Sequence, residues 1–256
     1  MKLCCAQFSP RWGDVASNLR RAGDMMRRAA ERGADLICFP EQFATGWSPA
    51  PVFAPEDLQG KIVSTLRSFA KEHKIAVLGS FIEDFSPKPR NTAFLANERG
   101  EILGLYAKMH PFAPGGEDRF IHPGGRRLLI DIHGVSLGVA ICYDLRFPSL
   151  FQGYAEEGAN AALVPAAWPC RRRRHWQIFV QARAIENQMY VAGINCTGRT
   201  PIDDYCGGSM IVDPCGKVAA EAGESEELLI GEIDPDVVRR AREAFPAFGE
   251  RGGEDR

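Results

Sequence analysis

The chain has 256 residues, of which 45% are hydrophobic and 25% are charged. These proportions are typical of a folded globular protein and exclude a disordered, collagen-like or coiled-coil chain. The formal net charge of −2 predicts neither nucleic acid nor an anionic membrane surface as a partner. The eight cysteines include no CxxC pair and are too sparse for a disulfide scaffold, so we expect a reduced, cytoplasmic protein.

No segment of the sequence resembles a targeting signal or a membrane span. The opening residues are interrupted by Arg11 and contain no long apolar core, so they do not predict a signal peptide. No apolar run approaches the roughly 18 residues that a membrane-spanning helix requires. We therefore expect no membrane among the partners of this protein.

Strand-like and helix-like patterns alternate in the first third of the chain. Apolar runs predict strands, whereas apolar residues spaced by three and four predict helices. Gly33 lies where a helix-ending glycine is expected, directly before a buried strand. In chain order we expect a strand at 2–8, a helix at 17–32, a strand at 35–39, a helix at 57–73 and a strand at 75–81.

Hairpins follow in the middle of the chain, and helices then return. Turn residues at 98–100 and 133–134 predict two hairpins, and the loop between them, 109–125, is rich in proline and glycine. The hairpins take strands at 91–96, 102–106, 126–132 and 135–141. We then expect helices at 147–157, 174–188 and 235–243, and strands at 161–164, 190–195, 208–213, 217–222 and 228–233.

Helix–strand units interleaved with hairpins predict an α/β protein whose sheets are mixed, with helices outside. Two such sheets packed face to face give a four-layer α/β/β/α sandwich. No linker-like stretch divides the chain, so we expect a single domain over residues 1–256 with a polar tail at about 249–256.

Cys142 is the first candidate for chemistry, because it falls where an apolar strand ends and a turn into a helix begins. Free N–H groups at a helix start lower the pKa of a thiol and bind a developing oxyanion. A buried structural cysteine is the ordinary alternative at such a position. Asp144 and Arg146, which follow in the same turn, are expected to support it.

Two further polar residues follow strand-like runs in the same way. Glu41 comes directly after a buried strand, among aromatic residues that would desolvate its carboxyl group and raise its pKa towards that of a general base. Lys108 follows another strand and could stabilise negative charge, although a solvated lysine is the simpler explanation. An acid, a cation and a thiol at three strand ends form the set that acyl transfer requires.

The motifs around these residues, FPEQFATGW, YAKMHPF and GVAICYDLRFP, resemble those of the nitrilase, or carbon–nitrogen hydrolase, superfamily. The resemblance spans nearly the whole chain and supports the sandwich fold. The stretches AAWPCRRRRHWQ, QARAIENQMYVAGINCTG and REAFPAF are similar to the ω-amidase-like branch. That branch hydrolyses small ω-amides of 2-oxo acids, such as 2-oxoglutaramate, to the diacid and ammonia.

The resemblance implies roles for particular residues. Cys142 would be the nucleophile, Glu41 the general base, and Lys108 the stabiliser of the oxyanion together with the backbone N–H of Tyr143. Glu117 matches a second glutamate of the family and would position the substrate or Lys108. The reaction would pass through a thioester acyl-enzyme and would need no metal or organic cofactor.

Three residues are candidates for binding the substrate. Arg172 lies in a run of four arginines and matches an arginine of the branch, so it would bind a substrate carboxylate, although a solvated charged turn also explains the run. Trp168 and Phe43 would line the pocket. The five histidines show no HxH or HExxH spacing, so we do not expect a metal site.

Departures from the branch pattern at Gln42, Trp47 and Ala167 keep other substrates open. A nitrilase, an N-carbamoyl amino acid amidohydrolase and a deaminated-glutathione amidase would all use the same three residues. A non-catalytic binding or scaffold protein is the alternative from another class. The resemblance also implies a homodimer or larger homo-oligomer, with helices beside the active site as the contact.

Overall fold

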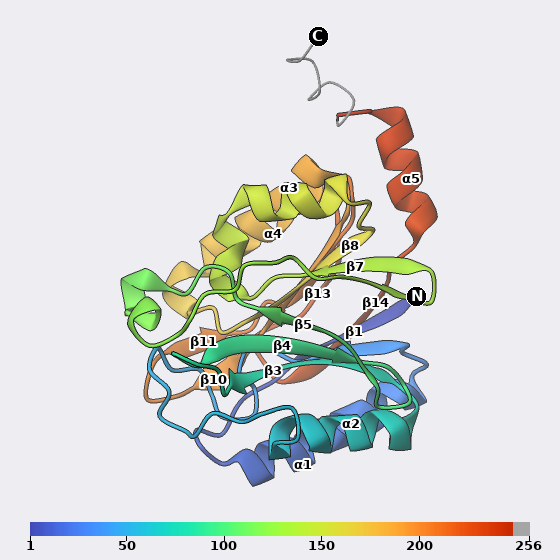
Figure 1. Cartoon of the computed structure of the whole chain (residues 1–256). Coiled ribbons are helices and arrows are strands. Elements are labelled where there is room, and N and C mark those ends of the chain that lie inside the picture. The colour runs from blue at the N-terminus through green and yellow to red at the C-terminus, as the bar shows by residue number, and fades with distance from the viewer. Residues whose placement is uncertain (248–256) are drawn as a thin grey trace.

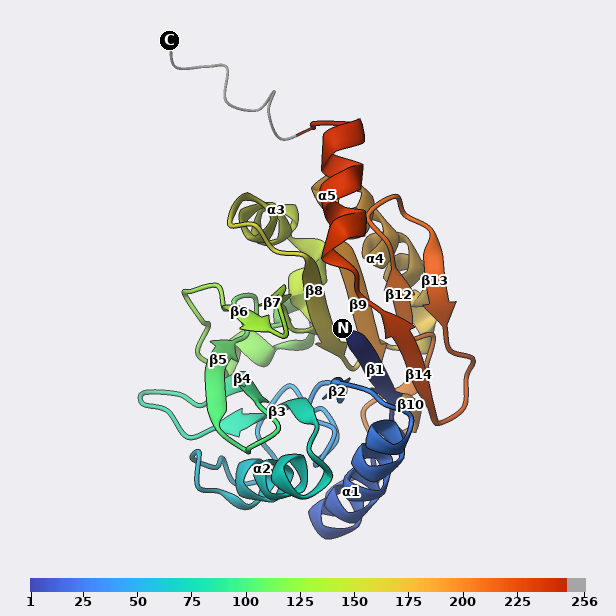
Figure 2. The same cartoon turned by 90° about the vertical axis from the view of Figure 1, so that its right-hand side faces the viewer.

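The computed structural model describes residues 1–247, in which two six-stranded sheets face each other between two pairs of helices (Figure 1; Figure 2). This arrangement confirms the predicted four-layer sandwich of mixed sheets. The first sheet has the order β14 (Glu227–Glu232), β1 (Lys2–Gln7), β2 (Leu36–Cys38), β3 (Ala76–Glu83), β4 (Arg90–Ala96) and β5 (Ile102–Ala107). The second has the order β13 (Val218–Glu221), β12 (Met210–Val212), β9 (Tyr190–Asn195), β8 (Ala161–Ala166), β7 (Val135–Val139) and β6 (Leu129–Ile132).

The two sheets repeat one pattern of strand directions. In the first, β1, β2 and β3 are parallel, and antiparallel strands extend the sheet on both sides. In the second, β7, β8 and β9 are parallel and are flanked in the same way. The carboxyl ends of parallel strands meet at one edge of a sheet, so residues that follow them gather there.

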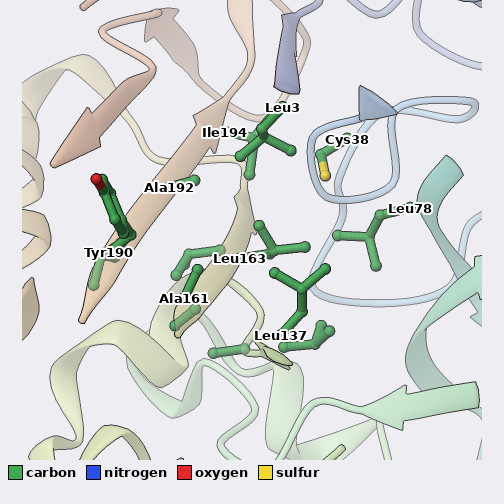
Figure 3. Packing of buried hydrophobic residues seen from close by; sticks show 14 of the residues in the cluster. Leu3, Cys38, Leu78, Leu137, Ala161, Leu163, Tyr190, Ala192 and Ile194 are labelled. Atoms are coloured by element: carbon green, nitrogen blue, oxygen red, sulfur yellow. The ribbon is translucent and has the colours of Figure 1, made fainter. Parts of the chain in front are cut away.

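Alternation of side chains in the buried strands explains the layers. In β1, Leu3 and Cys5 pack into the core between the sheets, whereas Cys4 and Ala6 pack beneath the outer helices. A period of two places successive side chains on opposite faces, and here both faces are covered. Figure 3 shows the core between the sheets, where Leu3, Cys38, Leu78, Leu137, Ala161, Leu163, Tyr190, Ala192 and Ile194 are labelled.

Helices α1 (Val15–Glu31) and α2 (Lys61–His73) cover the first sheet, and α3 (Pro148–Glu156) and α4 (Arg173–Asn187) cover the second (Figure 1). The carboxylate of Asp14 caps α1 by accepting a hydrogen bond from the Ser17 N–H at 3.0 Å. Helix α5 (Pro235–Ala244) lies beyond β14, and the Gln188 side chain at the end of α4 donates hydrogen bonds to the Ala241 carbonyl in α5 and to the Phe245 carbonyl just after it.

Several predicted boundaries differ from the structure. The helix expected at 57–73 begins only at Lys61, because the Glu56 carboxylate accepts from the Ile62 N–H and fixes the chain before it in a turn. The hairpin of β10 (Thr197–Arg199) and β11 (Asp204–Cys206) was not predicted. The loop at 109–125 contains two short 3₁₀ turns, Ala113–Gly115 and Glu117–Arg119.

The expectation that all the cysteines are reduced is wrong for two of them. Cys170 and Cys206 form a disulfide, although they are 36 residues apart in sequence. Spacing alone carried no sign of this pair, because no CxxC motif is involved. Within residues 1–247, no helix combines the length and the apolar character needed to cross a membrane. The predicted polar tail at about 249–256 lies outside the described residues.

Candidate active site

Three strand ends bring an acid, a cation and a thiol together. Glu41 follows β2, Lys108 follows β5 directly, and Cys142 follows β7 of the other sheet. The Nζ of Lys108 donates a hydrogen bond to Oε1 of Glu41 at 2.7 Å, and the Cys142 thiol hydrogen-bonds to the same carboxylate. Glu41 and Lys108 are each only 1% exposed, so this contact is shielded from bulk water.

The backbone at Cys142 is held in an unusual conformation. Its φ of 47° lies in the left-handed region, which costs free energy for any residue except glycine and is concentrated at functional sites. Cys142 begins a 3₁₀ turn, Cys142–Arg146, whose first N–H groups, including that of Tyr143, have no partner within such a turn. These N–H groups are therefore oriented to bind a negatively charged oxygen beside the sulfur.

The carboxylate of Asp144 holds this turn in place through hydrogen bonds, as the sequence predicts. Its Oδ2 accepts from the Tyr106 hydroxyl at 2.7 Å and from the Ile141 N–H at 2.9 Å. Its Oδ1 accepts from the His110 N–H at 2.8 Å. Asp144 is fully buried, so this network ties the turn to the strand end before Lys108 and resists any shift of the thiol.

Glu117 and Asn91 complete the buried polar cluster. Oε2 of Glu117 accepts from Lys108 Nζ at 2.8 Å and from the Phe112 N–H at 2.5 Å. The side-chain amide of Asn91 donates to Glu41 at 2.8 Å and to Glu117 at 3.1 Å. The Lys108 ammonium group is thus held between two carboxylates, and the amide of Asn91 fixes the distance between them.

Burial dominates the ionisation of Glu41. Desolvation raises the pKa of its carboxyl group, the negative charge of Glu117 raises it further, and the ammonium group of Lys108 opposes both effects. The sequence-based expectation of a raised pKa is confirmed in direction. A carboxylate of raised pKa is a stronger proton acceptor than an ordinary glutamate, as a general base requires.

The same surroundings raise the pKa of both Lys108 and Cys142, which keeps the amine charged and the thiol neutral. Burial lowers the pKa of Lys108, but the carboxylates of Glu117 and Glu41 outweigh burial and raise it, so the amine stays charged. Burial and the Glu41 charge raise the pKa of the Cys142 thiol, against the effects of Lys108 and of the Ala167 N–H. The expectation of a lowered thiol pKa is therefore wrong, and Cys142 must transfer its proton to a base before it can attack.

A cavity of about 160 Å³ opens directly over Cys142 and Lys108. This volume is close to that of an engineered cavity of about 150 Å³ that holds benzene, so the cavity accepts only a small molecule. Apolar walls come mainly from aromatic residues, Trp47, Phe112, Tyr143 and Trp168. A small, largely apolar cavity beside a reactive thiol favours a short substrate.

Arginines supply positive charge to one wall of this cavity. Arg171 pairs with Asp203 at 2.5 Å, which neutralises it. Arg146 and Arg172 also line the cavity, and neither has a carboxylate partner among residues 1–247. Burial lowers the pKa of Arg146, and the nearby charge of Arg172 lowers it further. The two guanidinium groups therefore leave an unbalanced positive charge that an anionic ligand would neutralise.

Two of the three residues predicted to contact the substrate line the cavity, and the third does not. Arg172 and Trp168 line the cavity, and the Trp168 indole is fixed by a 2.9 Å hydrogen bond from its Nε1 to the Arg172 carbonyl. Phe43 does not line it. That side chain is fully buried beneath the helices, stacked on Phe39 and edge-on to Phe8, so its expected place in the pocket is corrected to the core.

The comparisons with known proteins agree with this geometry. The family model described as carbon–nitrogen hydrolase matches residues 2–243. The chain belongs to the carbon–nitrogen hydrolase family. A 2-oxoglutaramate amidase of Bacillus subtilis is 34% identical over 248 residues, which cover 96% of this chain and 95% of that protein. An omega-amidase of Saccharomyces cerevisiae is 33% identical and is matched over 98% of this chain and 93% of its own length.

Solved structures of the family have the same fold. The yeast member of the nitrilase superfamily superposes with a TM-score of 0.88 at 32% identity, over 98% of this chain and 96% of that one. A variant of the Nesterenkonia sp. AN1 amidase, with acrylamide added to its active-site cysteine, has a TM-score of 0.86 at 29% identity, over 97% and 99% of the two chains.

Within this family fold, two polar residues near the thiol have roles that the sequence did not predict. Asn91 carries no recognisable signal, because it bonds to both glutamates only through strand pairing that brings β4 beside β5. Arg146, which is expected to support the turn, also lines the cavity. The sequence feature that could have indicated this place in the cavity wall is its position four residues after Cys142, in the same turn. No group of three or more potential metal-ligating side chains occurs in the described part of the hydrolase.

Proposed function

We propose that this carbon–nitrogen hydrolase is a cysteine-dependent amidase that releases ammonia from a small ω-amide of an acid, such as 2-oxoglutaramate. One observation carries the proposal. The Cys142 thiol forms a hydrogen bond with the buried Glu41 carboxylate and faces a small cavity with two arginines that have no carboxylate partner within residues 1–247. The similarity to the amidases of Bacillus subtilis and yeast supports the same reaction and the same class of substrate.

Acylation would begin with transfer of the Cys142 proton to Glu41 as the sulfur attacks the amide carbon. The carbonyl oxygen becomes negatively charged, and the Lys108 ammonium and the Tyr143 N–H stabilise it. Collapse of the tetrahedral intermediate breaks the carbon–nitrogen bond, and the proton held by Glu41 passes to the leaving ammonia. The product of this half-reaction is a thioester on Cys142.

Deacylation would use the same carboxylate with water as the nucleophile. Glu41 removes a proton from water, the hydroxide adds to the thioester carbon, and the carbon–sulfur bond then breaks. The proton returns from Glu41 to the Cys142 sulfur, which restores the thiol. Glu117 and Asn91 would act as positioning residues, because both hold the Glu41–Lys108 pair and neither lines the cavity.

The substrate's carboxylate would bind between Arg172 and Arg146, and Trp168 would pack against the carbon chain. Hydrogen bonds to charged groups contribute about 1.5–3 kcal/mol each. Replacement of Arg172 by glutamine should therefore raise KM for an acidic amide about 10- to 100-fold and leave KM for butyramide within twofold. Arg174→Gln is the matched control, because Arg174 is exposed and does not line the cavity.

The proposed reaction is tested by ammonia release from 2-oxoglutaramate, with Cys142→Ala as the control. The native enzyme should release ammonia and the variant none, and equal release by both would contradict the proposed reaction. Nitriles and N-carbamoyl amino acids belong in the same screen. Preference for a nitrile over the amide, or carbon dioxide released with the ammonia, would favour the corresponding alternative enzymes.

We also propose that the chain functions as one hydrolase domain in a cytoplasmic homodimer or larger homo-oligomer. Helix α4 supports this contact, because Ile178 and Ile185 are apolar and exposed on it, at 45% and 53%. A catalytic thiol is inactivated by oxidation and so favours a reducing compartment, where the Cys170–Cys206 disulfide would be open to reduction. Light scattering on the purified protein tests the oligomeric state, and a monomer that keeps full activity would contradict the proposal.

A further inference from the structure

The disulfide between Cys170 and Cys206 joins two segments that are distant in sequence. Cys170 begins the 3₁₀ turn Cys170–Arg172, which leads into α4, and Cys206 ends β11. Both cysteines are partly exposed, so a small reductant can reach the bond. The other cysteines are free, and Cys142 is among them.

Both segments joined by this bond supply the charged wall of the cavity. Arg171 and Arg172 come from the turn, whereas Asp203 and Tyr205 come from the hairpin of β10 and β11. Apart from the disulfide, the two segments share the Arg171–Asp203 ion pair and the backbone bridge between Pro169 and Tyr205. Arg171 is 58% exposed, and an ion pair this open to water contributes little.

The reacting groups are anchored independently of this bond. Glu41, Lys108 and Cys142 follow strands β2, β5 and β7, and none of them belongs to either joined segment. The chain that leads to the turn is also fixed before Cys170, because the Trp168 N–H donates to the side chain of Asn195 at 2.8 Å. The Trp168 indole Nε1 also donates to the Arg172 carbonyl at 2.9 Å, so loss of the disulfide loosens this end of the turn without releasing it and affects Arg172 before it affects the thiol.

We propose that the Cys170–Cys206 disulfide is a redox-controlled clamp that positions Arg172 and so gives the enzyme its selectivity for acidic over uncharged amides. This inference rests on the proposed function, because it takes Arg172 as the group that binds the substrate carboxylate. The oxidised enzyme holds the turn against the hairpin and keeps the guanidinium group in the cavity. The reduced enzyme loses that restraint and retains its amidase chemistry.

The redox step requires a dithiol reductant. The dithiol supplies two electrons and two protons, the sulfur–sulfur bond breaks, and Cys170 and Cys206 become thiols. The dithiol itself closes to a cyclic disulfide through a mixed-disulfide intermediate. In a reducing compartment the enzyme would accept acidic and neutral amides with similar KM, and oxidising conditions would lower KM for acidic amides alone.

The test compares two substrates in two redox states. Mass spectrometry of alkylated, unreduced protein first verifies the Cys170–Cys206 bond and a free Cys142 thiol. KM and kcat are then measured for glutaramate, which carries a carboxylate, and for butyramide, which does not, before and after dithiothreitol treatment. We expect reduction to raise KM for glutaramate about tenfold and to leave KM for butyramide and both kcat values within twofold.

Cysteine variants distinguish the effect of losing the Cys170–Cys206 disulfide from other effects of dithiothreitol. The double variant Cys170→Ala/Cys206→Ala should show the high KM for glutaramate without dithiothreitol and no further response to it. Cys215→Ala is the matched control, since Cys215 is exposed and free, and it should behave as the native protein does.

The outcomes for the clamp and for the proposed function are distinct. Absence of the disulfide, an unchanged KM for glutaramate, or an equal rise in KM for both substrates would overturn the clamp. Failure of the native enzyme to hydrolyse glutaramate and 2-oxoglutaramate in either redox state would instead overturn the proposed function.

Discussion

Replacement of Glu117 by glutamine removes one negative charge from the buried cluster while preserving the size of the side chain. In the native protein two carboxylate oxygens accept three hydrogen bonds, from Lys108 Nζ, the Phe112 N–H and the Asn91 side-chain amide. Glutamine offers one acceptor oxygen and directs its own N–H groups at the remaining donor. At least one donor is therefore left facing another donor in a site shielded from water.

The magnitude follows from that hydrogen-bond count. A hydrogen bond to a charged group contributes about 1.5–3 kcal/mol, and its loss at Lys108 weakens both folding and the positioning of the ammonium group. We expect Glu117→Gln to lower the Tm by about 3–12 °C for a chain of this size. If the same bond also holds Lys108 in the transition state, kcat falls about 10- to 100-fold.

The same substitution should change the pH dependence in a defined direction. The negative charge of Glu117 raises the pKa of Glu41, so its removal lowers that pKa. On the acidic side of the pH profile, kcat for butyramide falls as Glu41 becomes protonated, and we call this fall the acid limb. The acid limb should then lie at lower pH than in the native enzyme. Asp118→Asn, an exposed acid in the same 3₁₀ turn, is the matched control and should change neither kcat nor the limb.

Thermal unfolding followed by circular dichroism and ammonia release across pH 4–9 measure these effects. The reasoning is refuted if Glu117→Gln keeps kcat within twofold and leaves the acid limb unmoved. A lower Tm with unchanged kinetics would likewise reduce Glu117 to a purely structural role.

The remaining predictions concern the core, the turn and ionisation. Phe43→Leu should lower the Tm by about 1–12 °C, from a core change of about 0.5–3 kcal/mol, and leave KM within twofold; a tenfold higher KM would return Phe43 to the cavity. Asp144→Asn should lower both Tm and kcat, because the turn that holds Cys142 loses an acceptor, and native kinetics would contradict the account of that turn. The acid limb of kcat for the native enzyme should lie above pH 4.5, because the pKa of Glu41 is raised and catalysis requires its ionised form; a limb at or below 4.5 would contradict this.

The fold was accessible from the sequence because its signals are local. Apolar runs and helical spacing predicted the strands and helices, and the order of helix–strand units and hairpins predicted the layers. Glu41, Lys108 and Cys142 each follow a predicted strand directly or within three residues. Strand ends place Glu41 and Lys108 at one edge of the first sheet, and the facing second sheet brings Cys142 against them.

Features that depend on tertiary contacts were not accessible in this way. Asn91 touches both glutamates only because strand pairing brings β4 beside β5, and nothing in its neighbours marks that contact. Cys170 and Cys206 meet only because β11 folds back over the turn before α4. Phe43 was misplaced because an aromatic residue near a reactive acid is equally consistent with a cavity wall and with a core beneath a helix.

The central claim is that Cys142 forms a thioester with the substrate's acyl group. Rapid quenching of the enzyme with 2-oxoglutaramate, followed by mass spectrometry of the peptide that contains Cys142, tests it most directly. The account predicts an adduct on Cys142 equal in mass to the substrate less ammonia, and its absence from Cys142→Ala. Ammonia release with no adduct on Cys142, or with the adduct on another cysteine, would contradict the account.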